Sequence, residues 1–282
     1  MSRTKQFLDA IKFEHTIFAL PFAYVSMVLA AGGWPGWRVV FWVTAAMAGA
    51  RTTAMSVNRV VDRAIDAQNP RTSNRHLPRG IIRPSEMLML AAVSMMVLLV
   101  AAWQLNPLCL ALAPLACLFL TGYSYTKYLT WTSHWILGFT DGIAAAGGWI
   151  AVTGSFAAPA LLLWAAVTVW IAGFDLLYAC QDVDFDRAYG LHSVPERFGV
   201  PAALAVARAN HALTAAGLAA LGLMIPLGLL YWIGWFAVVG LLVYEHSLVS
   251  AGDLSRLNVA FFNVNGYIAV IMLAAVVSGL WR

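Results

Sequence analysis

The chain has 282 residues, of which 61% are hydrophobic and only 11% are charged, and its mean hydropathy is +0.76. Soluble domains average roughly 45–50% apolar and 25% charged residues, so this composition excludes an ordinary soluble protein and indicates an integral membrane protein. The formal net charge of +4 fits basic loops beside a membrane, and it gives no reason to expect a nucleic-acid partner.

Apolar runs close to the roughly 20 residues that a membrane-spanning helix needs predict nine helices. They cover residues 15–33, 37–57, 85–103, 107–125, 135–153, 158–180, 202–222, 226–245 and 259–281. No segment alternates between apolar and polar residues as barrel strands do. We therefore expect an all-α polytopic protein, with nine transmembrane helices bundled around a central cavity, and one domain that spans residues 1–282.

Lysine and arginine are distributed unevenly between the predicted loops. If the N-terminus is cytoplasmic, that side carries Arg3, Lys5, Lys12, the six arginines between positions 59 and 83, Lys127, Arg187, Arg197 and Arg256. The opposite side then holds Arg38 and Arg282. Because basic residues collect in cytoplasmic loops, we expect every polar loop longer than a few residues to face the cytoplasm.

Two short rows of acidic residues stand at the ends of predicted helices. Asn58, Asp62 and Asp66 recur at intervals of four residues, as do Asp182 and Asp186. At about 100° per residue, the first row spans roughly 80° of a helix surface and the second roughly 40°. Each row therefore lies on one helical face, where like charges repel and favour the binding of a cation.

The chemistry of these rows points to magnesium. Carboxylate and amide oxygens are hard ligands, and Mg²⁺ usually takes one or two protein carboxylates and completes its shell with water and substrate phosphate. The rows also lie at helix C-termini, where the backbone dipole favours cations. We predict Asn58, Asp62, Asp66, Asp182 and Asp186 as metal ligands, with neighbouring arginines and Lys127 free to hold phosphate oxygens.

Arg51 and Asp175 each precede one of the rows by seven residues. Seven residues return an α-helix to within about 20° of the same face and move about 10 Å along it. Both side chains should then point into one cavity, deeper in the membrane, where an ionisable residue is a functional candidate. The alternative is that Arg51 and Asp175 pair with one another or with other buried groups. A metal-bound diphosphate at the mouth and a polar floor would suit a lipid diphosphate.

At these residues the chain resembles the UbiA superfamily of intramembrane aromatic prenyltransferases, over essentially its full length. The first family motif is carried by Asn58, Asp62 and Asp66 with Arg63, and the second by Asp182 and Asp186, preceded by Asp175 and Tyr178 in F-D-L-L-Y-A. Arg51 stands where family members have a basic residue near the aromatic acceptor, and Y-S-Y-T-K, ending at Lys127, is similar to the family's tyrosine and lysine loop.

Three features depart from the family pattern. Arg59 follows Asn58 where many members have Asp, Tyr128 follows Lys127 where many have Arg, and the opening I-K-F-E-H-T-I-F-A-L-P is less basic than in the 4-hydroxybenzoate enzymes. The opening and the N-P-R-T-S-N-R loop are more similar to the branch that acts in the futalosine route to menaquinone.

The resemblance implies Mg²⁺-dependent transfer of a polyprenyl group from polyprenyl diphosphate to an aromatic acid in ubiquinone or menaquinone biosynthesis. The acceptor would be 4-hydroxybenzoate or a naphthoate-type acid of the futalosine pathway. Asp62, Asp182 and Asp175 would be catalytic, Arg63 and Lys127 would bind the diphosphate, and Arg51 and Tyr178 would bind the acceptor. We expect a bacterial cytoplasmic-membrane enzyme in contact with membrane lipid, with its active-site loops on the cytoplasmic side.

Other functions stay open at this point. Within the enzyme class the alternatives are haem O synthase, chlorophyll synthase and lipid-glycerol prenyltransferases. A secondary transporter could use Arg51 and Asp175 along its path. No histidine shows metal-ligand spacing, so we interpret the following as interfacial or packing groups: His15, His134, His192, His211 and His246. Ser193 lies in no nucleophile motif, which argues against hydrolase chemistry.

Overall fold

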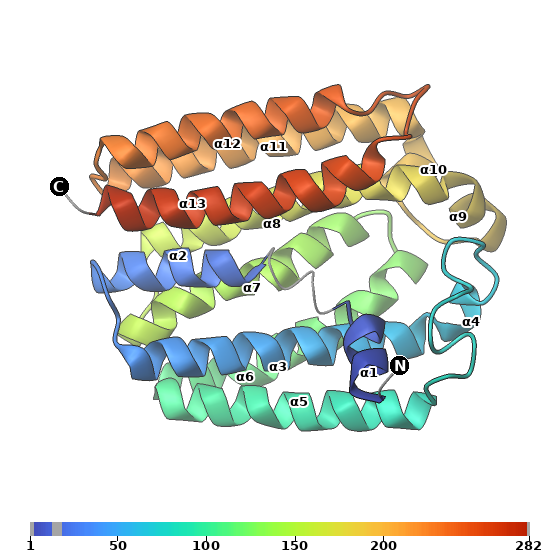
Figure 1. Cartoon of the computed structure of the whole chain (residues 1–282), viewed down its shortest axis with the longest axis horizontal. Helices are drawn as coiled ribbons and strands as arrows, with labels where there is room; N and C mark the ends of the chain where they lie inside the picture. The colour runs from blue at the N-terminus through green and yellow to red at the C-terminus, as the bar shows by residue number, and fades with distance from the viewer. Residues whose placement is uncertain (1–2, 13–18, 281–282) are drawn as a thin grey trace. The chain divides into compact units, whose positions relative to one another are not determined.

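The computed structural model describes residues 3–12 and 19–280, and within those ranges the regular secondary structure is helical (Figure 1). The one β-type contact there is an isolated bridge between Ser250 and Asp253. The prediction of an all-α protein is therefore confirmed. His15 and the first four positions of the run 15–33 lie outside the described residues.

The long helices follow the predicted apolar runs closely. They are α2 (Ala19–Ala31), α3 (Trp37–Val61), α5 (Pro84–Leu105), α6 (Pro107–Gly122), α7 (Ser133–Thr153), α8 (Ala158–Ala179), α11 (Val200–Met224), α12 (Leu229–Ser247) and α13 (Asn265–Gly279). The short helices are α1 (Arg3–Ala10), which precedes the long helices, and α4 (Arg63–Asp66), α9 (Val183–Tyr189) and α10 (Val194–Phe198), which lie between them. Two 3-10 turns, η2 (Tyr123–Tyr128) and η3 (Cys180–Asp182), and a π-helical stretch, η4 (Val259–Val264), complete the chain.

Helix boundaries follow from capping chemistry. Asn106 Oδ1 accepts the Cys109 N–H at 3.0 Å and satisfies a free donor at the start of α6. Glu86 Oε2 accepts the Arg83 N–H at 2.7 Å at the start of α5, where Pro84 also favours a first helical turn. Gly154, with φ of 65°, ends α7 in the left-handed conformation that glycine adopts most readily.

Within residues 3–12 and 19–280, six helices are long and apolar enough to cross a membrane, which supports an integral membrane protein. They cover Pro84–Leu105, Pro107–Tyr128, Ser133–Thr153, Ala158–Tyr189, Leu229–Ser247 and Val259–Gly279. The other three predicted runs form the shorter α2 and the helices α3 and α11, both of which carry arginine. Nine membrane crossings therefore stay a prediction.

The chain forms two compact units. Unit 1 contains Met1–Thr16 and Phe41–Tyr125, and unit 2 contains Ile17–Val40 and Thr126–Arg282. Each unit thus combines two separate stretches of sequence. A single domain around a central cavity stays a prediction.

In unit 1, α3 packs closely on α5. Thr53 Oγ1 donates to the Ala91 carbonyl at 3.3 Å, and a Cβ added at Gly49 would meet the Ser94 carbonyl oxygen at 2.7 Å. Small residues permit such close approach between helices in membranes. The short helix α1 docks its Ala10 end on the loop before α5, in a buried cluster that includes Leu77. This packing leaves the C-terminal end of α3 beside α1 and the charged loop.

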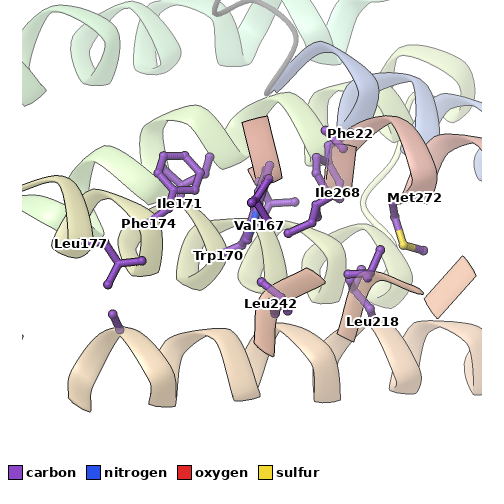
Figure 2. Packing of buried hydrophobic residues seen from close by; sticks show 14 of the residues in the cluster. Phe22, Val167, Trp170, Ile171, Phe174, Leu177, Leu218, Leu242, Ile268 and Met272 are labelled. Carbon is purple, nitrogen blue, oxygen red and sulfur yellow. The ribbon is translucent and has the colours of Figure 1, made fainter. Parts of the chain in front are cut away.

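In unit 2, α8 is the central helix. Its Trp170 is fully buried and contacts Phe22 of α2, with ring centroids 4.9 Å apart. Figure 2 shows Trp170 in a layer with Leu218 of α11, Leu242 of α12 and other apolar side chains of α8 and α13. The packing against α7 and α11 buries one side of α8 along most of its length. It fixes the helix whose C-terminal end carries Asp175 and Tyr178 and leads into η3, where Asp182 lies.

Candidate functional site

The first acidic row lies where α3 runs into α4. Asp62 N–H donates to the Asn58 carbonyl at 2.9 Å and Asp66 N–H to the Asp62 carbonyl at 2.7 Å, so helical hydrogen bonding continues past the end of α3 at Val61. Asn58 Nδ2 donates to Asp62 Oδ2 at 3.0 Å, which places these two side chains together as their four-residue spacing predicts. Asp62 and Asp66 are only 2% and 5% exposed.

Two arginines accompany this row. Arg75 Nη1 lies 2.8 Å from both carboxylate oxygens of Asp66, and Thr72 Oγ1 donates to the Asp66 carbonyl at 3.1 Å. Arg59 Nη1 lies 3.4 Å from Asn58 Oδ1. Sequence reasoning selected Arg63 as the arginine of this motif and missed Arg75, which reaches the row from nine residues further along the chain. Buried carboxylates of this kind require nearby positive charge.

Arg59, at the position where the sequence departs from the family pattern, is directed toward α1. Its Nε donates to the Ala10 carbonyl at 2.9 Å, and the side chain is buried. Burial, reinforced by the positive charge of Arg75, lowers the pKa of Arg59 to about 10, although Asp66, Tyr123 and Asp62 act in the opposite direction. Arg59 thus stays charged at neutral pH and joins the first acidic row to the N-terminal helix.

Arg63 and Arg51 differ from these partnered arginines. Arg63 is exposed, and its side chain makes no hydrogen bond or ion pair with the part of the chain that the structure describes. Arg51 is half-buried on α3, and its Nε is a buried donor without a hydrogen-bond partner there. Because an unsatisfied buried donor costs free energy, Arg51 is suited to bind an anionic group.

The second acidic row begins where α8 tightens into the 3-10 turn η3. Successive residues of a 3-10 helix are about 120° apart, against about 100° in an α-helix. The three residues of η3, Cys180–Asp182, therefore rotate the chain by roughly 60° more than predicted. The helix is therefore interrupted where an uninterrupted one was predicted. The extra rotation places Asp182 about 40° from Asp175 around the axis, where about 20° was predicted, so a shared face of Asp175 and Asp182 stays a prediction.

Asp175 has a partner that sequence reasoning did not identify. His134 Nδ1 lies 2.7 Å from Asp175 Oδ2, and His134 Nε2 lies 3.3 Å from the backbone nitrogen of Val194. His134 was expected to be an interfacial or packing residue, but it is 3% exposed and uses both ring nitrogens. Its position before the apolar run of α7 gave no signal for this contact, because α7 and α8 meet only in the folded unit.

Asp186 is held by the turn that follows α9. Ser193 Oγ donates to Asp186 Oδ2 at 3.0 Å and accepts the Glu196 N–H at 3.2 Å, which caps α10. The Leu191 N–H donates to the Asp186 carbonyl at 2.9 Å. Ser193 is therefore no nucleophile candidate but a hydroxyl that orients a predicted metal ligand.

Lys127 lies in the 3-10 turn η2, and its carbonyl accepts the His192 N–H at 2.7 Å. The same loop after α9 therefore fixes the backbone of Lys127 and the side chain of Asp186. Lys127 Nζ lies 5.5 Å from the ring centroid of Tyr128, the residue that stands where many family members have Arg. A cation–π contact of this kind steadies the ammonium group.

Tyr178 packs against the π-helical stretch η4. Its ring centroid lies 4.3 Å from that of Phe261, at an interplanar angle of 33°. Asn265 Nδ2 donates at 3.2 Å to the carbonyls of both Ala260 and Phe261, and at 2.8 Å to Glu245 Oε1. These bonds satisfy carbonyls at a widened helical turn, a feature that occurs frequently at functional sites. Sequence reasoning treated 259–281 as one regular helix and missed it.

The oxygen donors fit magnesium. Among the described residues, no group of three or more His, Cys, Asp and Glu side chains is placed to hold a metal ion. Mg²⁺, however, commonly takes only one or two protein carboxylates, and water and substrate phosphate supply its other ligands. Each row offers two carboxylates, and the first adds the amide oxygen of Asn58. Asp66 would have to share or exchange its contact with Arg75.

Comparison with known proteins identifies the family. The model of the UbiA prenyltransferase family matches residues 19–267. The chain belongs to the UbiA prenyltransferase family. The resemblance to this family is thereby confirmed. This UbiA protein is a membrane prenyltransferase, as predicted.

Relatives and solved structures agree with this assignment. The 4-hydroxybenzoate octaprenyltransferase of Aliivibrio salmonicida is 27% identical over 98% of this chain and 99% of its own length. The enzyme of that name from Nitrosospira multiformis is 30% identical over 82% of this chain and 80% of its own. The apo structure of a UbiA homolog from Aeropyrum pernix K1 has a TM-score of 0.86 and 32% identity, covering 94% of this chain and 97% of that one.

A UbiA homolog from Archaeoglobus fulgidus bound to GPP and Mg²⁺ has the same fold. It is 19% identical to this chain, with a TM-score of 0.74, and the match covers 97% of this chain and 99% of that one. Another UbiA protein with this fold therefore binds GPP and Mg²⁺.

Proposed function

We propose that this UbiA protein transfers a polyprenyl group from polyprenyl diphosphate to an aromatic acid, in a reaction that requires Mg²⁺. The observation that carries the proposal is the pair of acidic rows, each at a helix end and each held by its own hydrogen bonds. Relatives named as 4-hydroxybenzoate octaprenyltransferases support the reaction class.

The acidic rows are proposed to bind the metal. Asn58, Asp62 and Asp66 form one donor set, and Asp182 and Asp186 form the other. Mg²⁺ bound there would neutralise the diphosphate and so make it a better leaving group. The GPP and Mg²⁺ complex of the Archaeoglobus fulgidus homolog supports the choice of metal.

The remaining predicted residues have different tasks. Lys127 and Arg63 are proposed to bind diphosphate oxygens, because both are cations beside an acidic row. Arg51 is proposed to bind the acceptor carboxylate, for which its unpartnered Nε is suited. Tyr178, whose ring is fixed against Phe261, is proposed to contact the acceptor ring, and Asp175 to accept a hydrogen bond or proton from the acceptor.

The acceptor is proposed to be 4-hydroxybenzoate, the substrate in the names of the relatives. The opening segment and the N-P-R-T-S-N-R loop favour instead a naphthoate-type acid of the futalosine route to menaquinone. Both acids carry the carboxylate that Arg51 would bind, so this residue does not separate them. The enzyme is further proposed to lie in the bacterial cytoplasmic membrane with its polar loops on the cytoplasmic side.

A transfer assay tests the proposal. Purified protein in detergent is incubated with Mg²⁺, radiolabelled octaprenyl diphosphate and a panel of aromatic acids that includes 4-hydroxybenzoate and a hydroxynaphthoate. We expect a prenylated acid in the organic extract and release of diphosphate. Labelled product with only one acid identifies the acceptor, whereas product with neither acid, from folded protein, contradicts the proposed function.

A further inference from the structure

The loop after α9 contacts two predicted site residues of unit 2, Lys127 and Asp186, and also contacts His134. The His192 N–H donates to the Lys127 carbonyl, Ser193 Oγ donates to Asp186, and the Val194 N–H lies at His134 Nε2. His134 in turn contacts Asp175. His134, Ser193 and Val194 are each less than 5% exposed, so the contacts of these three residues are shielded from solvent. The loop and His134 thus form a connected scaffold around Asp175, Asp186 and Lys127.

The two contacts of His134 determine its tautomer. A backbone N–H can only donate, so His134 Nε2, 3.3 Å from the Val194 nitrogen, must be the acceptor and carry no proton. The proton of the neutral ring is then on Nδ1, which donates to Asp175 Oδ2 at 2.7 Å. In a doubly protonated ring, Nε2–H and the Val194 N–H would both be donors, and no hydrogen bond could form between them. Val194 is the first residue of α10, so its N–H has no partner within that helix.

We infer that His134 is a positioning residue that acts through Asp175. Its fixed Nδ1–H occupies Oδ2 and sets the rotamer of Asp175, which leaves the second carboxylate oxygen for a polar hydrogen of the aromatic acceptor. Among the described residues His134 is the only hydrogen-bonding partner of the Asp175 side chain. That side chain is 25% exposed and so is accessible to a ligand. This inference rests on the proposed function.

The same turn also links Asp175 to the second acidic row. Ser193 orients Asp186 through its side chain, and the next residue, Val194, sets the tautomer of His134 through its backbone. Residues 193 and 194 are joined by one peptide bond. The position of the predicted acceptor contact and that of the predicted metal ligand therefore depend on a single turn.

Two substitutions of His134 each remove one of its two hydrogen bonds and keep the other. In H134N the side-chain amide replaces Nδ1 and can still donate to Asp175, but nothing replaces the acceptor for Val194. In H134Q the amide reaches the position of Nε2 and can accept the Val194 N–H, but no donor remains for Asp175. A hydrogen bond to a charged group contributes a factor of roughly 10 to 100, so H134Q should lose that much in kcat/KM for 4-hydroxybenzoate.

We expect H134N to stay close to the parent in kcat/KM for the acid, and both variants to keep the parental KM for octaprenyl diphosphate. In a cycle with D175N, the loss caused by H134Q should shrink, because the two residues act as one unit. A purely structural role of His134 predicts equal losses in both variants together with lower melting temperatures. Equal losses in H134N and H134Q, or a loss unchanged by D175N, would overturn the inference.

A second measurement is made on the parent protein and uses a variant only to assign the signals. Nitrogen-15 NMR of histidine-labelled parent protein distinguishes a neutral ring protonated at Nδ1 from one protonated at Nε2 and from an imidazolium. We expect His134 in the first form, assigned by the loss of its signals in H134N. Either other form would overturn the inference even if H134Q failed to fold. Absence of prenyl transfer by the folded parent would instead contradict the proposed function, and the NMR result would still decide the tautomer.

Discussion

A single nitrogen of Arg75, Nη1, lies 2.8 Å from both carboxylate oxygens of Asp66. Asp66 is 5% exposed and lies at the end of α4, whereas the Arg75 side chain is 28% exposed. The buried carboxylate therefore has its charge partner in a loop that is in contact with solvent. The same carboxylate is a predicted magnesium ligand, so the guanidinium and the metal would compete for it.

Replacing Arg75 by Leu should lower the free energy of unfolding by roughly 1–3 kcal/mol in metal-free buffer, because a buried polar group is left unsatisfied. Added MgCl₂ should then raise the melting temperature of R75L more than that of the parent, since the metal replaces the lost charge. Thermal unfolding in detergent measures both effects. R79L, a change at an exposed arginine of the same loop, is the matched control. Parental melting of R75L without Mg²⁺ would contradict this prediction.

Asp62→Asn and Asp182→Asn should each lower turnover by at least about a hundredfold, the scale for loss of charge stabilisation in a transition state. EDTA should abolish the activity of the parent, and Mg²⁺ should restore it. The matched control is D184N, because the Asp184 side chain lies on α9 beside the second row and is 96% exposed. Undiminished turnover in D62N, in D182N or in EDTA would rule out the metal assignment.

Lys127→Met should weaken binding of polyprenyl diphosphate and leave the KM of the acceptor unchanged, because only the diphosphate would lose a charged contact. Binding is measured with radiolabelled octaprenyl diphosphate in the absence of acceptor. R187M removes a charge from the nearby helix α9, where the Arg187 side chain is 61% exposed, and should bind as the parent does. Equal binding by K127M and the parent would make Lys127 an ordinary basic loop residue.

Arg51→Leu should raise the KM of the acceptor or abolish transfer, with diphosphate binding retained, because a guanidinium binds a carboxylate strongly in a medium of low dielectric constant. The rival explanation is an ion pair between Arg51 and Asp175, although Asp175 already has His134 as a partner. A large fall in the melting temperature of R51L, rescued in R51L/D175L, would support that pair. Normal melting with lost acceptor use supports the acceptor site.

Helix positions were predictable from the sequence because the apolar runs are long and are bounded by Pro, Gly and Asn. The predicted run 85–103 corresponds to α5 at Pro84–Leu105, and the run 135–153 corresponds to α7 at Ser133–Thr153. The prediction failed where the helix type changes. Neither the 3-10 turn at Cys180–Asp182 nor the π-helical stretch at Val259–Val264 alters hydrophobicity, so composition gave no sign of them.

The predicted metal ligands could be recognised in the sequence, but the residues that hold the site residues in place could not. A four-residue spacing between Asn58 and Asp62 is visible in the sequence, and their side chains do meet. Arg75 and His134 carried no such signal, because their contacts join segments that come together only on folding. The roles of the predicted site residues in catalysis stay predictions until the variants above are measured.

The division of the chain between the two units affects the order of membrane insertion. Helix α2 belongs to unit 2 and packs on α7, where a Cβ added at Gly148 would lie 2.3 Å from the Ala23 carbonyl oxygen. The ribosome makes α2 early and its partner α7 only after α3, α5 and α6 of unit 1. During synthesis α2 is therefore made well before α7, the helix on which it packs. A nascent chain that ends at residue 125 therefore holds the helices of unit 1 together with an α2 that lacks its packing partner α7.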